Sequence, residues 1–354
     1  MKILFLGGDF SKSGGTERVA SIIPNELARR THDVVVAGVS GGKQAFFPLD
    51  CNVKVTSIFN SSGRNLFRFP KLVAKLRKLL IEEKPDVLVV VESMLTLFTI
   101  PAIIGLPIKH ICWEHFNFKS DLGRKGRRIA RQLAARFCDV VVTLSDRDRR
   151  YWLRHTMHKA TIVTIPNPSP FAVVNDDLYS IDSRVVLAMG RLVEQKGYDL
   201  LLAAWRQASP KAPGWRLRIV GDGPDREALV ALASSFGIAS TVDFVEATAD
   251  VRKHYKEAAI YCLSSRFEGF GMVLVEAMSF GIPAVSFDCD AGPAEVLEGT
   301  GSRLVGPEDV EGLGDAMVAL IENPDVRRHV STLSRIKAER YQPDFVLERW
   351  LKIL

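Results

Sequence analysis

The stretch SSRFEGFGMVLVEAMSFGIPAV, residues 264–285, combines a glycine-rich loop, a short helix and the start of a strand. It directly follows the apolar run Ile260–Leu263, and the apolar residues between Val273 and Met278 predict a buried helix. A second apolar run, Ala284–Phe287, comes next. Strand, helix and strand in this order form the repeating unit of a parallel α/β sheet.

The same alternation extends along the chain. Short apolar runs without period-two alternation are typical of parallel strands that are covered on both faces. The other runs are Lys2–Leu6, Asp33–Val39, Val87–Val91, Val140–Leu144, Ile162–Ile165, Arg184–Met189, Leu217–Val220 and Val242–Val245. Helical patterns separate them, so the fold class predicted is α/β with two doubly wound, Rossmann-like domains.

The domain boundary is predicted at IPNPSPF, residues 165–171, because its three prolines cannot continue a helix or a central strand. A new strand opens at Arg184. We therefore expect a first domain over residues 1–166 and a second over 167–342, facing each other across a cleft. An amphipathic helix over 343–354 is expected to cross back to the first domain.

The composition is that of an ordinary globular protein: 354 residues, 47% hydrophobic and 25% charged. The five cysteines have neither metal-ligand nor CxxC spacing, which favours reduced thiols in a cytoplasmic protein. The first ten residues are too short an apolar run for a signal peptide. The longest apolar stretch, residues 87–106, is interrupted by Glu92 and Pro101 and predicts a strand and a helix, not a membrane span.

Two acids in the opening stretch are candidate ligand-binding residues. Glu268 precedes the loop of Gly269, Phe270 and Gly271, and Glu276 lies eight residues after Glu268. Glycines beside a helix N-terminus let backbone N–H groups approach a ligand closely. The alternative is that Glu268 is a helix cap and Glu276 a solvated surface charge. The apolar neighbours of Glu276 argue against an unpartnered surface role for that residue.

Two further loops follow predicted strands. Arg191 and Lys196 come after the strand Arg184–Met189, where two cations suit a diphosphate, although two surface cations are the simpler alternative. Gly14 and Gly15 follow the first strand, with Thr16 a candidate cap for a helix over residues 17–27. That loop either contacts phosphate or is a plain βα connection. The turn Gly221–Gly223 is weak evidence for phosphate, and a structural turn is the better reading.

The order of these motifs, GR…KG, GDGP, E-x7-E and G-x-P, resembles the retaining glycosyltransferases of family 4, which have the GT-B fold. The resemblance covers essentially the whole chain and includes GGTERV and IPNP near the start and at the hinge. It implies that Glu268 binds the donor sugar, that Gly269, Phe270 and Gly271 contact it by their backbone, and that Glu276 binds the ribose. It also implies that Arg191 and Lys196 neutralise the leaving diphosphate, and that Gly14 and Gly15 line the donor site.

Family members also have a histidine at the end of a strand that faces the donor sugar, which implies a hydrogen-bonding role for His115 in CWEHFNF. Glu114 is a weaker candidate. The resemblance further implies a UDP-sugar donor, retention of the anomeric configuration without a strong protein base, and an acceptor that is a lipid-linked glycan or glycolipid of surface polysaccharide synthesis.

Charge is distributed unevenly between the two halves. Residues 1–165 carry 27 Lys and Arg against 14 Asp and Glu, whereas residues 166–354 carry 20 against 27. Two helical patterns in the first half place basic residues on one face. They are Arg64, Arg68, Lys71, Lys75 and Lys78, and then Arg124, Arg127, Arg128 and Arg131. Such faces predict contact with an anionic membrane surface or a lipid diphosphate, and hence a protein peripheral to the inner face of the cell membrane. A solvated surface over a core helix is the alternative, and no stacking platform supports nucleic acid.

Two DxD strings, Asp146/Asp148 and Asp288/Asp290, have no third ligand that can be nominated, so no required metal is predicted. Asp146 instead looks like a helix start after Ser145. Other functions stay open: a glycosyltransferase with a soluble acceptor, and a non-catalytic binding subunit of the same fold. A nicotinamide-dependent oxidoreductase is disfavoured because the GxGxxG fingerprint is missing after the first strand.

Overall fold

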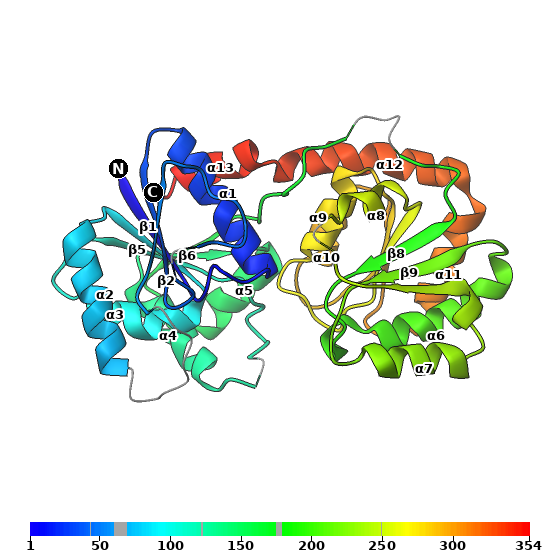
Figure 1. Ribbon diagram of the computed structural model, residues 1–354, viewed down its shortest axis with the longest axis horizontal. Coiled ribbons are helices and arrows are strands. Elements are labelled where there is room, and N and C mark those ends of the chain that lie inside the picture. Colours follow the sequence, from blue (N-terminus) through cyan, green and yellow to red (C-terminus); the bar gives the residue numbers. More distant parts are fainter. Residues whose placement is uncertain (43, 60–68, 122, 175–178, 249) are drawn as a thin grey trace. The chain divides into compact units, whose positions relative to one another are not determined.

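The computed structural model describes residues 1–42, 44–59, 69–121, 123–174, 179–248 and 250–354. The chain forms two compact units (Figure 1). Unit 1 comprises Met1–Pro170 together with Pro343–Leu354, and unit 2 comprises Phe171–Gln342. The predicted boundary after residue 166 lies within the same proline-rich segment as the observed one after Pro170.

Unit 1 is built on a seven-stranded sheet of order β3-β2-β1-β4-β5-β6-β7, in which every pairing is parallel. Its strands are β1 (Lys2–Gly7), β2 (Asp33–Gly38), β3 (Val53–Ser57), β4 (Val87–Val91), β5 (Lys109–Trp113), β6 (Val140–Thr143) and β7 (Thr161–Thr164). Its helices are α1 (Gly15–Arg29), α2 (Phe69–Glu83), α3 (Thr96–Ile103), α4 (Gly126–Phe137), α5 (Asp146–His155) and α13 (Pro343–Leu351).

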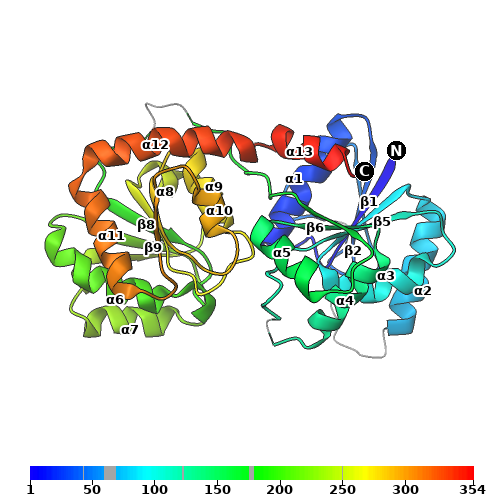
Figure 2. The same cartoon turned by 180° about the vertical axis from the view of Figure 1, so that it is seen from behind.

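Helices cover both faces of this sheet, so the central strands are buried throughout (Figures 1 and 2). Leu76 of α2 and Ala102 of α3 pack on Leu88 and Val90 of β4 on one face. Helices α1 and α13 lie against each other. A strand with apolar side chains on both faces reads as a continuous apolar run, which is why β4 is so plain in the sequence.

The last segment of the chain completes the core of unit 1. Trp350 of α13 is fully buried and packs edge-on against Trp113 of β5, with ring centroids 4.8 Å apart. On the surface, Arg30 pairs with Glu348 at 2.6 Å and with Asp344 at 3.3 Å. Unit 1 therefore consists of two segments that are distant in sequence.

Unit 2 has a six-stranded sheet of order β10-β9-β8-β11-β12-β13, again with every pairing parallel. Its strands are β8 (Val185–Met189), β9 (Arg216–Val220), β10 (Val242–Val245), β11 (Ile260–Leu263), β12 (Ala284–Phe287) and β13 (Arg303–Val305). Its helices are α6 (Tyr198–Ala208), α7 (Arg226–Ser235), α8 (Arg252–Lys256), α9 (Met272–Ser279), α10 (Pro293–Leu297), α11 (Val310–Glu322) and α12 (Pro324–Ala338).

The strand orders confirm the predicted pair of doubly wound α/β domains and show where a ligand would bind. In unit 1 the order reverses between β1 and β4, and in unit 2 between β8 and β11. Loops that leave neighbouring strands in opposite directions open a crevice at the carboxyl ends of the strands. Each unit thus has one such switch point.

Three strands were missing from the predicted set. The strand β5 begins with the polar Lys109 and His110, shortly after α3, so it has no separate apolar run. The short strands β3 and β13 are only partly buried, so they lack a continuous apolar run.

Candidate active site

At the switch point of unit 2, two predicted residues meet. Lys196 lies in the loop after β8 and Glu268 in the loop after β11, and Lys196 Nζ is 2.6 Å from Glu268 Oε1. The hydroxyl of Ser265 also donates to Glu268 Oε1, at 2.7 Å. The side chains of Lys196 and Glu268 are 20% and 9% exposed, so the pair is shielded but reachable.

The two loops are fastened to each other next to this pair. Arg266 donates two parallel hydrogen bonds to Asp199, at 2.9 and 2.7 Å, and Gln195 donates to the carbonyl of Phe267 at 3.0 Å. Gly197 has a φ of 61°, and a Cβ there would lie 2.1 Å from the carbonyl oxygen of Ser264. Only glycine permits this approach, so the loops form one preorganised unit.

Glu276 lies inside unit 2 and not on its surface. It is 7% exposed, on α9, and the hydroxyl of Tyr255 donates to its Oε2 at 2.7 Å. Gly271 forms the N-cap of α9 with a φ of 87°, which glycine adopts without strain. Tyr255 was not predicted, because nothing in the sequence marks a tyrosine on α8 as the partner of an acid on α9.

The other predicted donor residues have different settings. The Arg191 guanidinium is exposed, with no ion-pair or hydrogen-bond partner in the described part of the chain. The ring of Phe270 is buried, 5.9 Å from that of Tyr341, beside Gly269 and Gly271.

The turn Gly221–Gly223 has a clear structural role. A Cβ at Gly221 would lie 2.0 Å from the carbonyl oxygen of Gly190, and a Cβ at Gly223 would lie 2.1 Å from that of Leu192. These glycines therefore allow the loops after β8 and β9 to pack backbone on backbone. This agrees with the prediction that the turn has a structural role.

In unit 1, the helix after β1 starts earlier than predicted. Gly14 is its N-cap and α1 begins at Gly15, so the prediction that Thr16 caps the helix is wrong. A Cβ on Gly14 would lie 2.1 Å from Glu17 Oε2. Burial raises the pKa of Glu17 above its usual value, so this carboxyl beside the helix start holds its proton more tightly than an exposed one.

His115 follows β5 and is 7% exposed, with its ring centroid 4.6 Å from that of Trp113. Burial lowers its pKa to about 3, so the imidazole is neutral at physiological pH. Its Nε2 is buried without a hydrogen-bond partner among the described residues. Such a ring can hydrogen-bond a substrate hydroxyl but is too weakly basic to hold a proton at pH 7.

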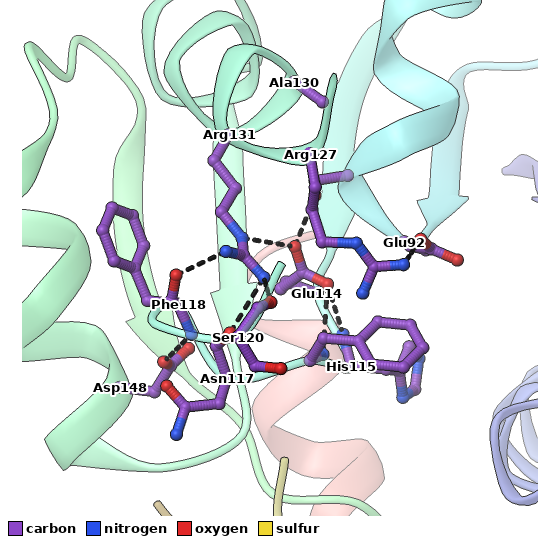
Figure 3. Close-up of polar contacts among 12 residues, drawn as sticks. Glu92, Glu114, His115, Asn117, Phe118, Ser120, Arg127, Ala130, Arg131 and Asp148 are labelled. Carbon is purple, nitrogen blue, oxygen red and sulfur yellow. Dashed lines mark hydrogen bonds and ion pairs between the residues drawn. The ribbon is translucent and has the colours of Figure 1, made fainter. Parts of the chain in front are cut away.

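Two of the four arginines predicted to meet a membrane are buried. Arg127 and Arg131 of α4 are 2% and 1% exposed and face acids at the strand ends (Figure 3). Arg127 Nη2 is 2.5 Å from Glu92 Oε1, and Arg131 Nε is 3.5 Å from Glu114 Oε2. The prediction fails for this pair because their helical spacing also fits the face that packs inward.

The acids of this network have perturbed surroundings. Burial, followed by the nearby charge of Glu114, raises the pKa of Glu92 to about 7. Burial likewise raises the pKa of Asp148 to about 7. Asp148 accepts a hydrogen bond from the backbone of Phe118 at 2.7 Å (Figure 3).

Arg124 and Arg128 are exposed, as predicted, and Arg128 pairs with Asp121 at 2.8 Å. On α4, Ile129 and Phe137 are 60% and 57% exposed. Met157 is 86% exposed. It lies beside α4, because the backbone N–H of Lys159, two residues later, donates to the carbonyl of Ala135 on that helix. We call the residues Arg128, Ile129, Arg136, Phe137 and Met157 the α4 surface.

The second basic pattern is described only in part. Arg64 and Arg68 lie outside the described residues, whereas Lys71, Lys75 and Lys78 are exposed on α2. Within the described ranges, no helix is long and apolar enough to cross a membrane.

The DxD string at Asp146 serves the fold. Ser145 caps α5 by accepting from the backbone of Asp148 at 3.1 Å, as the sequence predicts, and Thr164 donates to Asp146 at 2.6 Å. Over the described part of the chain, no three His, Cys, Asp or Glu side chains gather as a metal site would require.

Both units of the chain match known glycosyltransferases in sequence. Residues 13–169 match the family model described as Glycosyltransferase Family 4, and residues 183–323 match Glycosyl transferases group 1. An uncharacterized glycosyltransferase of Haemophilus influenzae is 34% identical over 357 residues, covering 100% of this chain and 99% of that protein.

A Campylobacter jejuni relative is 29% identical, over 100% of this chain and 98% of its own length. It is named GalNAc-α-(1→4)-GalNAc-α-(1→3)-diNAcBac-PP-undecaprenol α-1,4-N-acetyl-D-galactosaminyltransferase. Among solved structures, Anabaena HepE in complex with UDP and glucose matches with a TM-score of 0.80 and 21% identity, over 100% of this chain and 99% of that one.

Proposed function

The chain belongs to the glycosyltransferases of family 4, with the GT-B fold, and from this membership we propose that it transfers a hexose or N-acetylhexosamine from a UDP-sugar to a lipid-linked glycan or glycolipid. The anomeric configuration would be retained. The observation that carries the proposal is the shielded Lys196–Glu268 pair at the switch point of unit 2, with buried Glu276 on the helix that follows.

Each of these groups has a role in the proposed reaction. Glu268 accepts hydrogen bonds from donor-sugar hydroxyls, and Glu276, oriented by Tyr255, accepts them from the ribose. Lys196 and exposed Arg191 stabilise negative charge on the diphosphate as the glycosidic bond breaks. The fastened loops fix these groups before the substrate binds, which lowers the entropic cost of reaching the transition state.

Retention is proposed to proceed by attack on the face that the diphosphate leaves. The acceptor oxygen forms the new bond to the anomeric carbon, and its proton passes to a leaving phosphate oxygen. This scheme needs no strong protein base, which agrees with the neutral, weakly basic His115 in unit 1. No metal is required in this proposal, since cationic side chains supply the charge.

The acceptor and membrane parts of the proposal rest on a relative and on the α4 surface. The Campylobacter jejuni relative is named for a glycan on PP-undecaprenol. Exposed Ile129, Phe137 and Met157 beside Arg128 and Arg136 combine apolar and basic groups, which suits the interface of an anionic membrane. The basic half of the chain would add to this attraction, which supports the proposed position at the inner face of the cell membrane.

The primary test is UDP release from a panel of UDP-hexoses and UDP-N-acetylhexosamines, in EDTA, with and without polyprenyl-diphosphate-linked sugars. We expect one donor to be consumed and the lipid-linked sugar to raise the rate sharply. A rate that lipid does not change would indicate a soluble acceptor. Restoration of activity only by added Mg²⁺ or Mn²⁺ would overturn metal independence, and no turnover at all would indicate a non-catalytic protein.

Membrane contact has its own test. Replacing Ile129 and Phe137 by serine removes the apolar part of the α4 surface, and each buried side chain of this size is worth about 1.5–3 kcal/mol. We therefore expect partition onto phosphatidylglycerol vesicles to fall at least tenfold. Val230→Ser, on the exposed face of α7 in unit 2, is the control and should leave partition unchanged. If the double variant partitions onto the vesicles as strongly as the wild type, the α4 surface does not contact the membrane.

A further inference from the structure

The two arginine–glutamate pairs of unit 1 differ in how many of their donor and acceptor atoms have hydrogen-bond partners. Arg131 donates to the carbonyls of Asn117 and Ser120, both at 2.8 Å, and to that of Phe118, besides facing Glu114 (Figure 3). Glu114 in turn accepts from the hydroxyl of Ser93 and from the backbone of the two residues that follow it. This pair is saturated and shapes the loop after β5.

The second pair is open. Arg127 donates to Glu92 through Nη2 only, while its Nε and Nη1 are buried without partners in the described part of the chain. Its guanidinium stacks 4.0 Å from the ring centroid of Phe116. Glu92 has Oε1 against Arg127, but Oε2 has no partner among the described residues, and the side chain is 23% exposed. One carboxylate oxygen is therefore held and the other is accessible.

The backbone of Glu92 is strained. Its φ is 90°, where a residue with a Cβ rarely lies. Glu92 directly follows β4, at the β1/β4 switch point, and its N–H donates to the carbonyl of Trp113 at 2.8 Å, two residues before His115. This strained conformation places a partly exposed carboxylate at the edge where unit 1 is expected to bind its substrate.

We propose that Glu92 binds hydroxyl groups of the acceptor sugar through its accessible oxygen, with Arg127 as the positioning residue that holds the other oxygen. This inference rests on the proposed glycosyl transfer and names the acceptor group that unit 1 recognises.

The charges at this edge distinguish a hydroxyl from a phosphate. Both buried arginines are already paired with carboxylates, and two acids stand at neighbouring strand ends. A phosphate placed against Glu92 would lie beside a second acid, Glu114, and the two buried arginines already face these acids, so its negative charge is disfavoured there. A neutral sugar hydroxyl donates to a carboxylate instead, and such charge-assisted hydrogen bonds are strong. We therefore assign the accessible oxygen of Glu92 to a hydroxyl of the acceptor sugar.

The test compares transfer with acceptor-free donor hydrolysis. Glu92→Gln keeps an oxygen for Arg127, and Glu92→Asp keeps the charge but withdraws it from the strand end. With a polyprenyl-diphosphate-linked N-acetylhexosamine, we expect kcat/KM for the acceptor to fall roughly 10–100-fold in both variants, mainly through KM, as fits a lost hydrogen bond to a charged group. UDP release in the absence of acceptor should stay within twofold of wild type. Glu82→Gln, an exposed acid on α2, is the matched control.

A methyl glycoside of the same sugar, used as acceptor or as competitive inhibitor, separates the two ligand chemistries. We expect Glu92→Gln to weaken it by the same factor as the lipid-linked sugar. Weakening confined to the diphosphate acceptor would overturn the assignment to hydroxyls. Normal transfer, or an equal fall in transfer and hydrolysis, would also overturn it while leaving the proposed function intact. A wild-type chain without donor turnover would remove the proposed function and this inference with it.

Discussion

Replacing Arg131 by methionine should strongly lower the stability of unit 1, although the sequence predicted a surface cation at this position. The guanidinium is 1% exposed and donates to three loop carbonyls besides facing Glu114. Methionine retains much of the apolar stem but satisfies none of these acceptors. The variant therefore removes one donor from the Glu114 carboxylate and one from each of the three carbonyls.

The expected cost follows from these contacts. Each buried polar group left unsatisfied costs about 1–3 kcal/mol, and removing one partner of a buried ion pair costs about 3–5 kcal/mol in total once the surroundings relax. Glu114 keeps three other donors, so the lower part of that range is the better expectation. For a unit of this size, about 3 kcal/mol corresponds to a fall in melting temperature of roughly 6–12 °C.

Thermal and urea unfolding by circular dichroism would measure the change, with hydrogen exchange of β4 and β5 to assign it to unit 1. Arg128→Met is the matched control on the same helix, because Arg128 is 78% exposed and exposed pairs contribute about 0–1 kcal/mol. A melting temperature for Arg131→Met within 2 °C of that of Arg128→Met, a spread of roughly one exposed ion pair, would refute the reasoning.

Three further outcomes are expected. Lys196→Met should slow donor turnover about 10²–10³-fold with little change in melting temperature, because it removes the cation beside Glu268, and turnover within threefold of wild type would exclude this role. Tyr255→Phe should weaken UDP binding about tenfold in calorimetry by releasing Glu276, and an unchanged Kd would show that the hydroxyl does not orient this acid. Burial lowers the pKa of His110 to about 4, whereas the unfolded chain takes up this proton near pH 6.5. The stability that neutral His110 contributes is therefore present above pH 6.5. It is lost as the pH falls toward 4, by about 3 kcal/mol. Urea midpoints of wild type and His110→Gln between pH 7 and 4 would measure this, and parallel curves would contradict it.

Much of the fold was predictable because parallel strands buried on both faces leave a direct record in the sequence. The runs at β4 and β11 match the structure residue for residue. Strands with a polar start or exposed side chains, such as β5 and β13, leave no such record. The α/β class and the position of the proline-rich boundary follow from strands of the first kind.

The site was harder to predict because its contacts join residues far apart in sequence. Lys196 and Glu268 could be named from their places after two strands, but not as partners. Arg127 and Arg131 have the spacing of a basic surface, and only their proximity to acids at the ends of β4 and β5 shows that they face inward. Glu92 looked like an interruption of an apolar stretch, since its strained backbone has no signature in the sequence.

The position of α13 has a consequence for biosynthesis. Unit 1 lacks part of its core until residues 343–354 have left the ribosome, because Trp350 fills the space against Trp113. At roughly 5–20 residues per second, synthesis of unit 2 delays that moment by about 10–30 s. During this interval unit 2 can fold while unit 1 waits with exposed apolar surface. A chain that stops before residue 343 would therefore contain an incomplete first unit, which chaperones and proteases can recognise, so α13 makes the folding of the N-terminal half dependent on translation of residues 343–354.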